Sequence, residues 1–326
     1  MTGGRVKNKT MLNRRDFLKI GGTGLAGAAL LGVAGCGSGG GGGGSGSSGP
    51  KASVGSKKFT EQILLGEMYA QAFEDKGYDV KRELNLGSEQ VMDKALQDGT
   101  IDLYPEYTGT AYVAILGKPP ESYPKTEEET YRQVAKFYKN RKDTQMQMLE
   151  PAPFENNYGI VMLTKTANEM NIDTLNDLAA KSDQLVFSSY SEFQNRSDGY
   201  DNMKEHYPKL DFKEIKIVND LGIRYKALAE NEADVGIGFT TDGQLASPKL
   251  KVIKDTKVIW PKYYPAPVVL QSFLDKNPDA KKILNEVDQS LNADIMRKLN
   301  GQVDLEQRDY EDVARDHLEQ AGVING

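Results

Sequence analysis

Two hydrophobic periods alternate along the chain after residue 50, and each change of period marks a new predicted element. Leu65, Met68, Tyr69, Ala72 and Phe73 recur at the spacing of an amphipathic helix, which Gly77 should end. Short apolar or alternating runs on either side of this helix indicate strands. The pattern predicts strands at 52–54, 80–84 and 101–104, with a second helix at 88–97 between the last two.

The same alternation continues to the C-terminus. Thr126 and Glu129 form a capping box that should open a helix, and a long helical region is expected from Pro278 to Gly301. Regular alternation of strands and helices favours parallel α/β sheets. The remaining predicted strands are 145–149, 158–163, 185–188, 214–218 and 234–239, and the remaining predicted helices lie near 174–181, 197–206 and 222–230.

The N-terminus carries the features of an export signal. Six basic residues precede an apolar stretch at 20–35, which is the layout of a signal peptide. Sixteen residues would rise about 24 Å as a helix, less than the roughly 30 Å hydrocarbon core of a bilayer. Residues 1–35 are therefore predicted to be a signal peptide. Its Arg14-Arg15 pair, followed by Phe17-Leu18-Lys19, resembles a twin-arginine signal, although Asn13 departs from the usual Ser or Thr, and an ordinary Sec signal stays open.

The single cysteine, Cys36, closes this apolar stretch. Val33-Ala34-Gly35-Cys36 is the acceptor pattern of bacterial lipoproteins, in which the thiol takes a diacylglycerol and becomes the new N-terminus. Gly and Ser fill 37–49, a composition that behaves as a flexible coil. We therefore expect 36–50 to be a lipidated tether that holds the protein on the extracytoplasmic face of the cell membrane.

Composition excludes several classes of function. Cleavage before Cys36 leaves 35 Lys and Arg against 46 Asp and Glu, a net charge of −11, which disfavours nucleic acid as a partner. The two histidines, His206 and His317, are expected at the surface, and neither stands beside a candidate nucleophile. No zinc-protease helix, nucleophile elbow or phosphate-binding glycine loop is visible in the sequence. We expect no metal, no cofactor and no enzyme activity, with an extracellular enzyme as the less favoured alternative.

Tyrosines cluster where glycine or proline interrupts predicted strands, which in open α/β sheets is where ligands bind. Four sequence motifs are specific enough to point to a protein family: Val54-Gly55-Ser56-Lys57-Lys58-Phe59-Thr60-Glu61-Gln62, Tyr104-Pro105-Glu106-Tyr107-Thr108-Gly109-Thr110, Ser191-Glu192-Phe193-Gln194-Asn195-Arg196-Ser197-Asp198-Gly199 and Phe239-Thr240-Thr241-Asp242-Gly243. In this order they resemble the glycine betaine, choline and carnitine binding proteins of ATP-binding cassette (ABC) importers, from about Ala52 to the C-terminus.

The resemblance implies an α/β, two-lobed fold like that of type II periplasmic binding proteins, a Venus flytrap that the chain enters and leaves through two hinge crossings. Lobe 1 would comprise 51–155 and 262–326, and lobe 2 would comprise 156–261. The ligand would lie between the lobes.

The resemblance also implies which residues bind. An aromatic cage for a trimethylammonium group would consist of Tyr107, Tyr158, Phe239 and Tyr263, with Tyr264 as a competitor for the last place. A carboxylate clamp would consist of Lys57, Thr110 and Arg196, with Lys58 as a competitor for Lys57. Relatives commonly have tyrosine where this chain has Phe239, a departure that keeps the aromatic face and loses a hydroxyl.

These residues suit the implied ligand, because a quaternary ammonium has no N–H to donate and must be recognised by shape and by the negative faces of rings. The expected function is capture of a compatible solute, glycine betaine or a relative, for import through an ABC permease in the same membrane during osmoprotection. Choline, another onium compound or an amino acid derivative remains open as the ligand.

Overall fold

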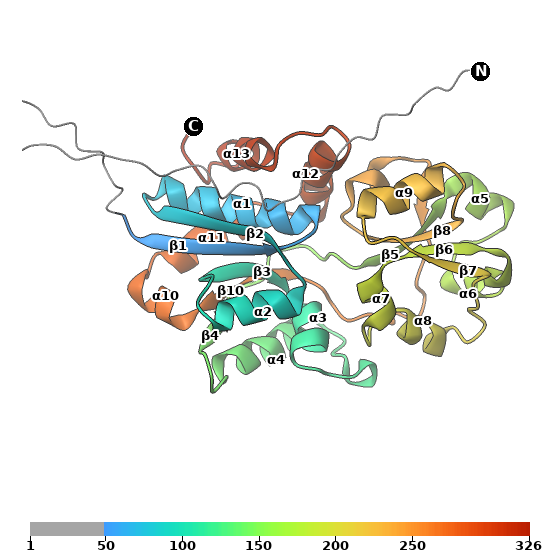
Figure 1. Cartoon of the computed structure of the whole chain (residues 1–326), viewed down its shortest axis with the longest axis horizontal. Helices are drawn as coiled ribbons and strands as arrows, with labels where there is room; N and C mark the ends of the chain where they lie inside the picture. The colour runs from blue at the N-terminus through green and yellow to red at the C-terminus, as the bar shows by residue number, and fades with distance from the viewer. Residues whose placement is uncertain (1–48) are drawn as a thin grey trace, which may run out of the picture. The chain divides into compact units, whose positions relative to one another are not determined.

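The computed structural model describes residues 49–326, and the first sheet of this part of the chain has the strand order β2-β1-β3-β10-β4. Figure 1 shows α1 and α13 on one side of β1 and β2, with α2 and α4 on the other. The sheet and its helices enclose one hydrophobic core, which includes Leu64, Phe73, Tyr104 and Val268. The bounds of its strands are β1 Lys51–Lys57, β2 Asp79–Gly87, β3 Leu103–Tyr107, β4 Met146–Met148 and β10 Pro265–Leu270.

The helices of this first group come from both ends of the described chain. α4 begins after Thr126, whose hydroxyl accepts a hydrogen bond from the backbone N–H of Glu129 at 3.2 Å, so the predicted cap forms with this half of the capping box alone. The helical region expected from Pro278 to Gly301 is two helices, Ala280–Gln289 and Ala293–Asp304, and Asn292 caps the second of them by accepting from the N–H of Ile295 at 2.9 Å. The bounds are α1 Thr60–Asp75, α2 Glu89–Gln97, α3 Thr108–Thr110, α4 Glu127–Lys139, α10 Gln271–Lys276, α11 Ala280–Gln289, α12 Ala293–Asp304 and α13 Tyr310–Gln320.

The second sheet has the order β7-β6-β8-β5-β9 and a separate core around Ile160, Phe187 and Ile237. Figure 1 shows α5 and α9 on one side of it and α6, α7 and α8 on the other. The bounds are β5 Tyr158–Leu163, β6 Val186–Ser189, β7 Glu214–Ile217, β8 Val235–Phe239, β9 Leu250–Val252, α5 Thr164–Glu169, α6 Leu175–Ala179, α7 Ser191–Asn195, α8 Tyr200–His206 and α9 Leu221–Ala229.

Both sheets are mixed, which corrects the prediction of parallel sheets. β1 pairs in parallel with β2 and β3, and β6 with β7 and β8. However, β10 runs antiparallel to β3 and β4, and β5 runs antiparallel to β8 and β9. β5 and β10 are the first strands of their sheets after the chain passes from one sheet to the other. The exact residues at which one lobe ends stay a prediction.

Two prolines lie opposite each other inside the first sheet. Pro105 of β3 pairs in register with Pro267 of β10. The carbonyl oxygen of Pro267 accepts from the N–H of Leu149, so this residue presents its backbone polar groups toward β4, away from β3. The N–H that Pro267 lacks would not have pointed toward β3, so the β3–β10 pairing loses no hydrogen bond at this position. This explains why the two neighbouring strands can each carry a proline here.

Candidate functional site

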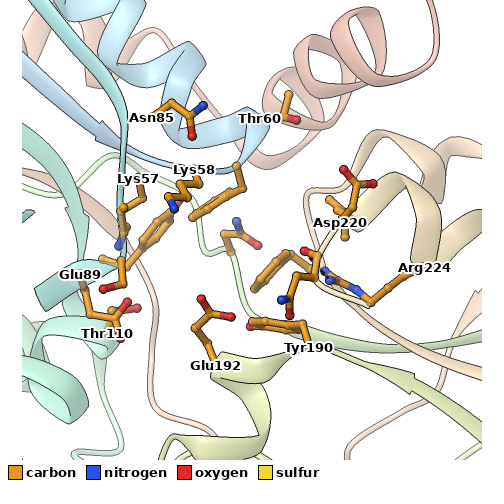
Figure 2. Close-up of a pocket in the computed structure, with 18 of the residues that line it drawn as sticks. Lys57, Lys58, Thr60, Asn85, Glu89, Thr110, Tyr190, Glu192, Asp220 and Arg224 are labelled. Atoms are coloured by element: carbon orange, nitrogen blue, oxygen red, sulfur yellow. Dashed lines mark hydrogen bonds between the residues drawn. The ribbon is translucent and has the colours of Figure 1, made fainter. Parts of the chain in front are cut away.

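A cavity of about 880 Å³ is lined by residues from both groups of elements. Figure 2 shows Lys57, Glu89 and Thr110 on one side of it and Asp220 and Arg224 on the opposite side. The wall includes all seven residues predicted to bind a ligand, namely Lys57, Tyr107, Thr110, Tyr158, Arg196, Phe239 and Tyr263. The sequence motifs therefore converge in space, while the role of each residue stays a prediction. Cys36, Arg14 and Arg15 lie outside the described residues.

Strand ends position the four predicted cage rings. Tyr107 ends β3, Tyr158 begins β5, Phe239 ends β8, and Tyr263 lies two residues before β10. Tyr158 and Phe239 are register partners in the antiparallel β5–β8 pair, which places their side chains on the same face of the sheet. The ring of Tyr158 lies 5.9 Å from that of Phe239 and 5.6 Å from that of Tyr263.

Two further rings belong to the same wall and were missed by the sequence analysis. Phe59 stacks between Tyr107, at 6.1 Å, and Phe239, at 5.7 Å. Tyr190 lies 6.2 Å from Phe239. A signal was available for both, because Phe59 stands inside a quoted motif and Tyr190 comes two residues after the strand predicted at 185–188.

The structure places the competing residues in different surroundings. Tyr263 is buried on the cavity wall and its hydroxyl donates to Asp198 at 2.5 Å, whereas Tyr264 is absent from the wall. Lys57 and Lys58 both line the cavity. They differ in surroundings, because Lys57 is buried and Lys58 is exposed.

Glycines in two motifs are required by close packing. A Cβ at Gly109 would lie 2.6 Å from Cδ1 of Tyr263 and 2.8 Å from the carbonyl oxygen of Lys262. A Cβ at Gly199 would lie 1.8 Å from the carbonyl oxygen of Phe193. Gly109 therefore lets the segment after β3 pack against Tyr263 of the cavity wall, and Gly199 lets the chain turn back on Phe193 within its own motif.

The two cations of the predicted clamp already have carboxylate partners. Lys57 forms a buried ion pair with Glu106. The guanidinium of Arg196 donates to both oxygens of Asp198, at 2.8 and 2.6 Å, and to Glu89 at 3.1 Å. Burial raises the pKa of Glu89, but the charges of Arg196 and Lys57 outweigh this effect and the pKa is lowered overall. This side of the cavity thus holds two cations against three acidic groups.

Glu61 joins the two groups of elements beside the cage. Its carboxylate accepts from the hydroxyls of Tyr107 at 2.6 Å and Thr241 at 2.5 Å, and from the amides of Asn156 at 2.8 Å and Asn300 at 3.1 Å. The side chain is buried and makes no ion pair with any described residue. Burial raises its pKa, and the four hydrogen bonds oppose that shift.

Asp242 supports the cage from behind Phe239. Its Oδ2 accepts from the backbone N–H of Phe239 at 2.7 Å and from the hydroxyl of Tyr225 at 2.8 Å. Burial, opposed by these hydrogen bonds, raises the pKa of Asp242 to about 7. The carboxyl group therefore fixes the strand end that carries the ring.

Neither histidine lines the cavity. The expectation that both lie at the surface is wrong for His317, which is buried beside the hydroxyl of Ser290 at 2.9 Å. Within residues 49–326, no cluster of three or more His, Cys, Asp or Glu side chains is arranged to hold a metal ion. In the same part of the chain, no helix combines the length and the apolar character needed to cross a membrane.

Comparison with known proteins identifies relatives of this chain. A glycine-betaine-binding protein of Pseudomonas aeruginosa is 31% identical over 290 residues, which cover 83% of this chain and 88% of that protein. An ergothioneine transport permease/ergothioneine binding protein, EgtU of Helicobacter pylori, is 31% identical over 271 residues; the match covers 83% of this chain but only 47% of that longer protein.

A solved structure titled as a glycine betaine/carnitine/choline ABC transporter superposes with a TM-score of 0.70 at 25% identity, covering 83% of this chain and 99% of that one. The family model described as the substrate binding domain of ABC-type glycine betaine transport systems matches residues 51–320. The chain therefore belongs to this family of substrate-binding proteins of ABC importers.

Proposed function

We propose that this protein captures a quaternary ammonium compatible solute, glycine betaine or a close relative, outside the cytoplasm and delivers it to an ABC permease for osmoprotection. The observation that carries the proposal is the set of aromatic rings on one cavity wall. Each desolvated contact between a cation and a ring contributes about 2 kcal/mol, and micromolar affinity requires roughly 8 kcal/mol. Several rings therefore supply a contribution of the right size without any covalent chemistry.

The binding residues that we propose follow from their positions on this wall. Tyr107, Tyr158, Phe239 and Tyr263 surround the ammonium group, and Phe59 and Tyr190 extend the aromatic surface. Lys57, Thr110 and Arg196 receive a carboxylate close to the ammonium. Because Lys57 and Arg196 are held by acidic partners, the carboxylate would compete with Glu106, Glu89 and Asp198 for them.

Ligand capture should use the two connections between the sheets as a hinge. One connection lies between β4 and β5 and the other between β9 and β10. We propose that lobe 1 (51–155 and 262–326) and lobe 2 (156–261) close over the ligand. Closure excludes water, which strengthens both the ring contacts and the carboxylate contacts.

We also propose that Cys36 is lipidated and that 36–50 tethers the binding protein to the membrane that holds its permease. Mass spectrometry of the mature protein purified from its native membrane should show an N-terminal diacylglyceryl cysteine. An unmodified Cys36, or a chain that still carries residues 1–35, would contradict this. Export of an Arg14-Arg15→Lys-Lys variant would separate the two routes, because only the twin-arginine route should be blocked.

Ergothioneine is a second candidate ligand, favoured by the name of the Helicobacter pylori relative. It fits the same site, because it too carries a trimethylammonium group. Choline is a third candidate and lacks a carboxylate.

A thermal-shift panel tests the proposal and ranks these ligands. Binding to the folded state alone adds about 2.7 kcal/mol to the free energy of unfolding when the ligand is present at one hundred times its dissociation constant. Glycine betaine, carnitine, choline and ergothioneine form the panel, with L-arginine as a cation lacking a quaternary ammonium. We expect at least one quaternary ammonium to raise the melting temperature and L-arginine to leave it unchanged. A panel in which no quaternary ammonium has an effect would contradict the proposed function.

A further inference from the structure

Arg224 presents a second guanidinium to the cavity, on the side opposite Lys57 and Thr110 (Figure 2). It is carried by α9 and is buried, with 3% of its surface exposed. Its guanidinium carbon lies 4.6 Å from the centre of the Tyr190 ring. Since Tyr190 neighbours Phe239 of the proposed cage, Arg224 stands next to the aromatic surface at its far end.

The hydrogen bonds of Arg224 hold the side chain in place but do not neutralise it. Nε donates to the carbonyl oxygen of Ile237 at 2.9 Å, and Nη1 donates to those of Val218 and Asn219 at 2.8 and 3.2 Å. A guanidinium has five N–H donors, and the two on Nη2 make no hydrogen bond to the described part of the chain. Three backbone acceptors thus fix the orientation of the fork and leave one arm available.

The acidic groups that face Arg224 are engaged elsewhere. Asp242 accepts from Tyr225 and from the backbone of Phe239, and Asp220 caps α9 by accepting from the N–H of Ile223 at 2.8 Å. Glu192 is exposed at the cavity edge. No carboxylate among residues 49–326 lies within ion-pair distance of Arg224. Arg196, by contrast, has two such partners.

A buried cation without a counter-ion is costly, because burial disfavours the charged form. Burial indeed lowers the pKa of Arg224. A bound anion would offset this cost through charge-assisted hydrogen bonds to the fork. Arg224 is thus a fixed, buried guanidinium that has no carboxylate partner among residues 49–326 and that lines the cavity.

We propose that Arg224, backed by Tyr190, forms an anion-binding subsite that receives the carboxylate of a zwitterionic ligand longer than glycine betaine. This inference rests on the proposed function, because the cage holds the ammonium end of the same ligand. Glycine betaine separates its charges by a single methylene, so it can serve only one side of the cavity at a time. The volume of about 880 Å³ lies in the upper part of the range for pockets that hold drug-sized ligands, which leaves room for a longer molecule.

The test compares carnitine with carnitine methyl ester, which differ in the charge at the end remote from the ammonium. Dissociation constants are measured by calorimetry for the parent, Arg224→Gln and Arg224→Lys. We expect the parent to prefer carnitine over its ester at least tenfold, and Arg224→Gln to reduce this preference to within about twofold. Arg224→Lys keeps a charge but loses the planar fork, so it should retain a reduced preference. The ratio of two affinities in one variant is insensitive to a general loss of stability.

Arg141→Gln provides a matched control, because Arg141 also lies over a ring, that of Phe137 at 5.5 Å, but outside the cavity. It should leave the ratio unchanged. If Arg224→Gln does not fold, a reduced ratio in Arg224→Lys supports the subsite and an unchanged ratio overturns it. A parent that binds glycine betaine but not carnitine, or that binds acid and ester equally, also overturns the subsite while the proposed function stands. A parent that binds no quaternary ammonium refutes the proposed function itself.

Discussion

Replacing Tyr158 by alanine is expected to weaken the binding of the preferred quaternary ammonium about thirtyfold. Its ring lies within 6 Å of the rings of Phe193, Phe239, Trp260 and Tyr263, so it is the best-connected member of the proposed cage. Loss of one desolvated cation–ring contact costs about 2 kcal/mol, and tenfold in affinity corresponds to about 1.4 kcal/mol. Calorimetry on the purified variant measures the effect, and Tyr158→Phe should keep most of the affinity because it keeps the aromatic face.

Tyr200→Ala separates loss of a ring contact from loss of packing. Tyr158 and Tyr200 are each 8% exposed and belong to the same core, but Tyr200 packs on Phe187 and Phe212 and does not line the cavity. Either alanine variant should lose about 3–5 kcal/mol of unfolding free energy. Only Tyr158→Ala should lose affinity by more than threefold. Equal losses of affinity in the two variants would show that Tyr158 acts through stability alone.

Glu61→Ala is expected to lower the free energy of unfolding by several kcal/mol and to weaken ligand binding. The substitution leaves buried donors on Tyr107, Asn156 and Thr241 without their acceptor, and each unsatisfied buried donor costs about 1–3 kcal/mol. Asn300 retains a second acceptor, the carbonyl oxygen of Thr241, and so loses less. Tyr107 ends β3 of the first sheet, and Thr241 follows β8 of the second sheet. Loss of the Glu61 carboxylate therefore also loosens the arrangement of the cage.

Two variants of the same helix calibrate this result. Glu61→Gln preserves shape and part of the hydrogen bonding, so its effect should be intermediate. Glu74→Ala removes a partly exposed ion pair with Arg82, which should change the unfolding free energy by about 1 kcal/mol or less. Denaturant unfolding measures all three. If Glu61→Ala were as mild as Glu74→Ala, the network around Glu61 would not stabilise the fold.

The spacing of apolar residues predicted well those helices and strands whose apolar side chains pack against the core. The strand at 158–163 matches β5, and the helices near 88–97 and 222–230 match α2 and α9 to within one residue at each end. Capping by Thr126 was predictable because the interaction spans only three residues. By contrast, β10 was missed because Pro265 and Pro267 disguise it, and only its pairing with β3 shows that the sheet accepts them.

In the candidate site, too, features set by the local sequence could be predicted and features set by long-range contacts could not. The family resemblance identified seven residues that share one cavity, and five of them, Lys57, Tyr107, Thr110, Arg196 and Phe239, lie in the quoted motifs. The motifs do not reveal the charge balance. Asp198 stands two residues from Arg196 in the same motif, but the contact of Arg196 with Glu89 spans 107 positions of the sequence and depends on the fold. The lack of a carboxylate partner for Arg224 among residues 49–326 depends on the fold in the same way. Likewise, Glu61 acquires its four donors from segments as distant as Asn300.

The most direct test of the central claim compares glycine betaine with 3,3-dimethylbutanoate, in which carbon replaces the quaternary nitrogen. The two molecules have nearly the same shape and the same carboxylate, so they differ only in the positive charge that the rings are proposed to recognise. If the cavity wall formed by Tyr107, Tyr158, Phe239 and Tyr263 binds a cation, calorimetry should show glycine betaine binding at least one hundredfold more tightly, about 2.8 kcal/mol. Equal affinity for the two molecules, or tighter binding of the carbon analogue, would contradict the account.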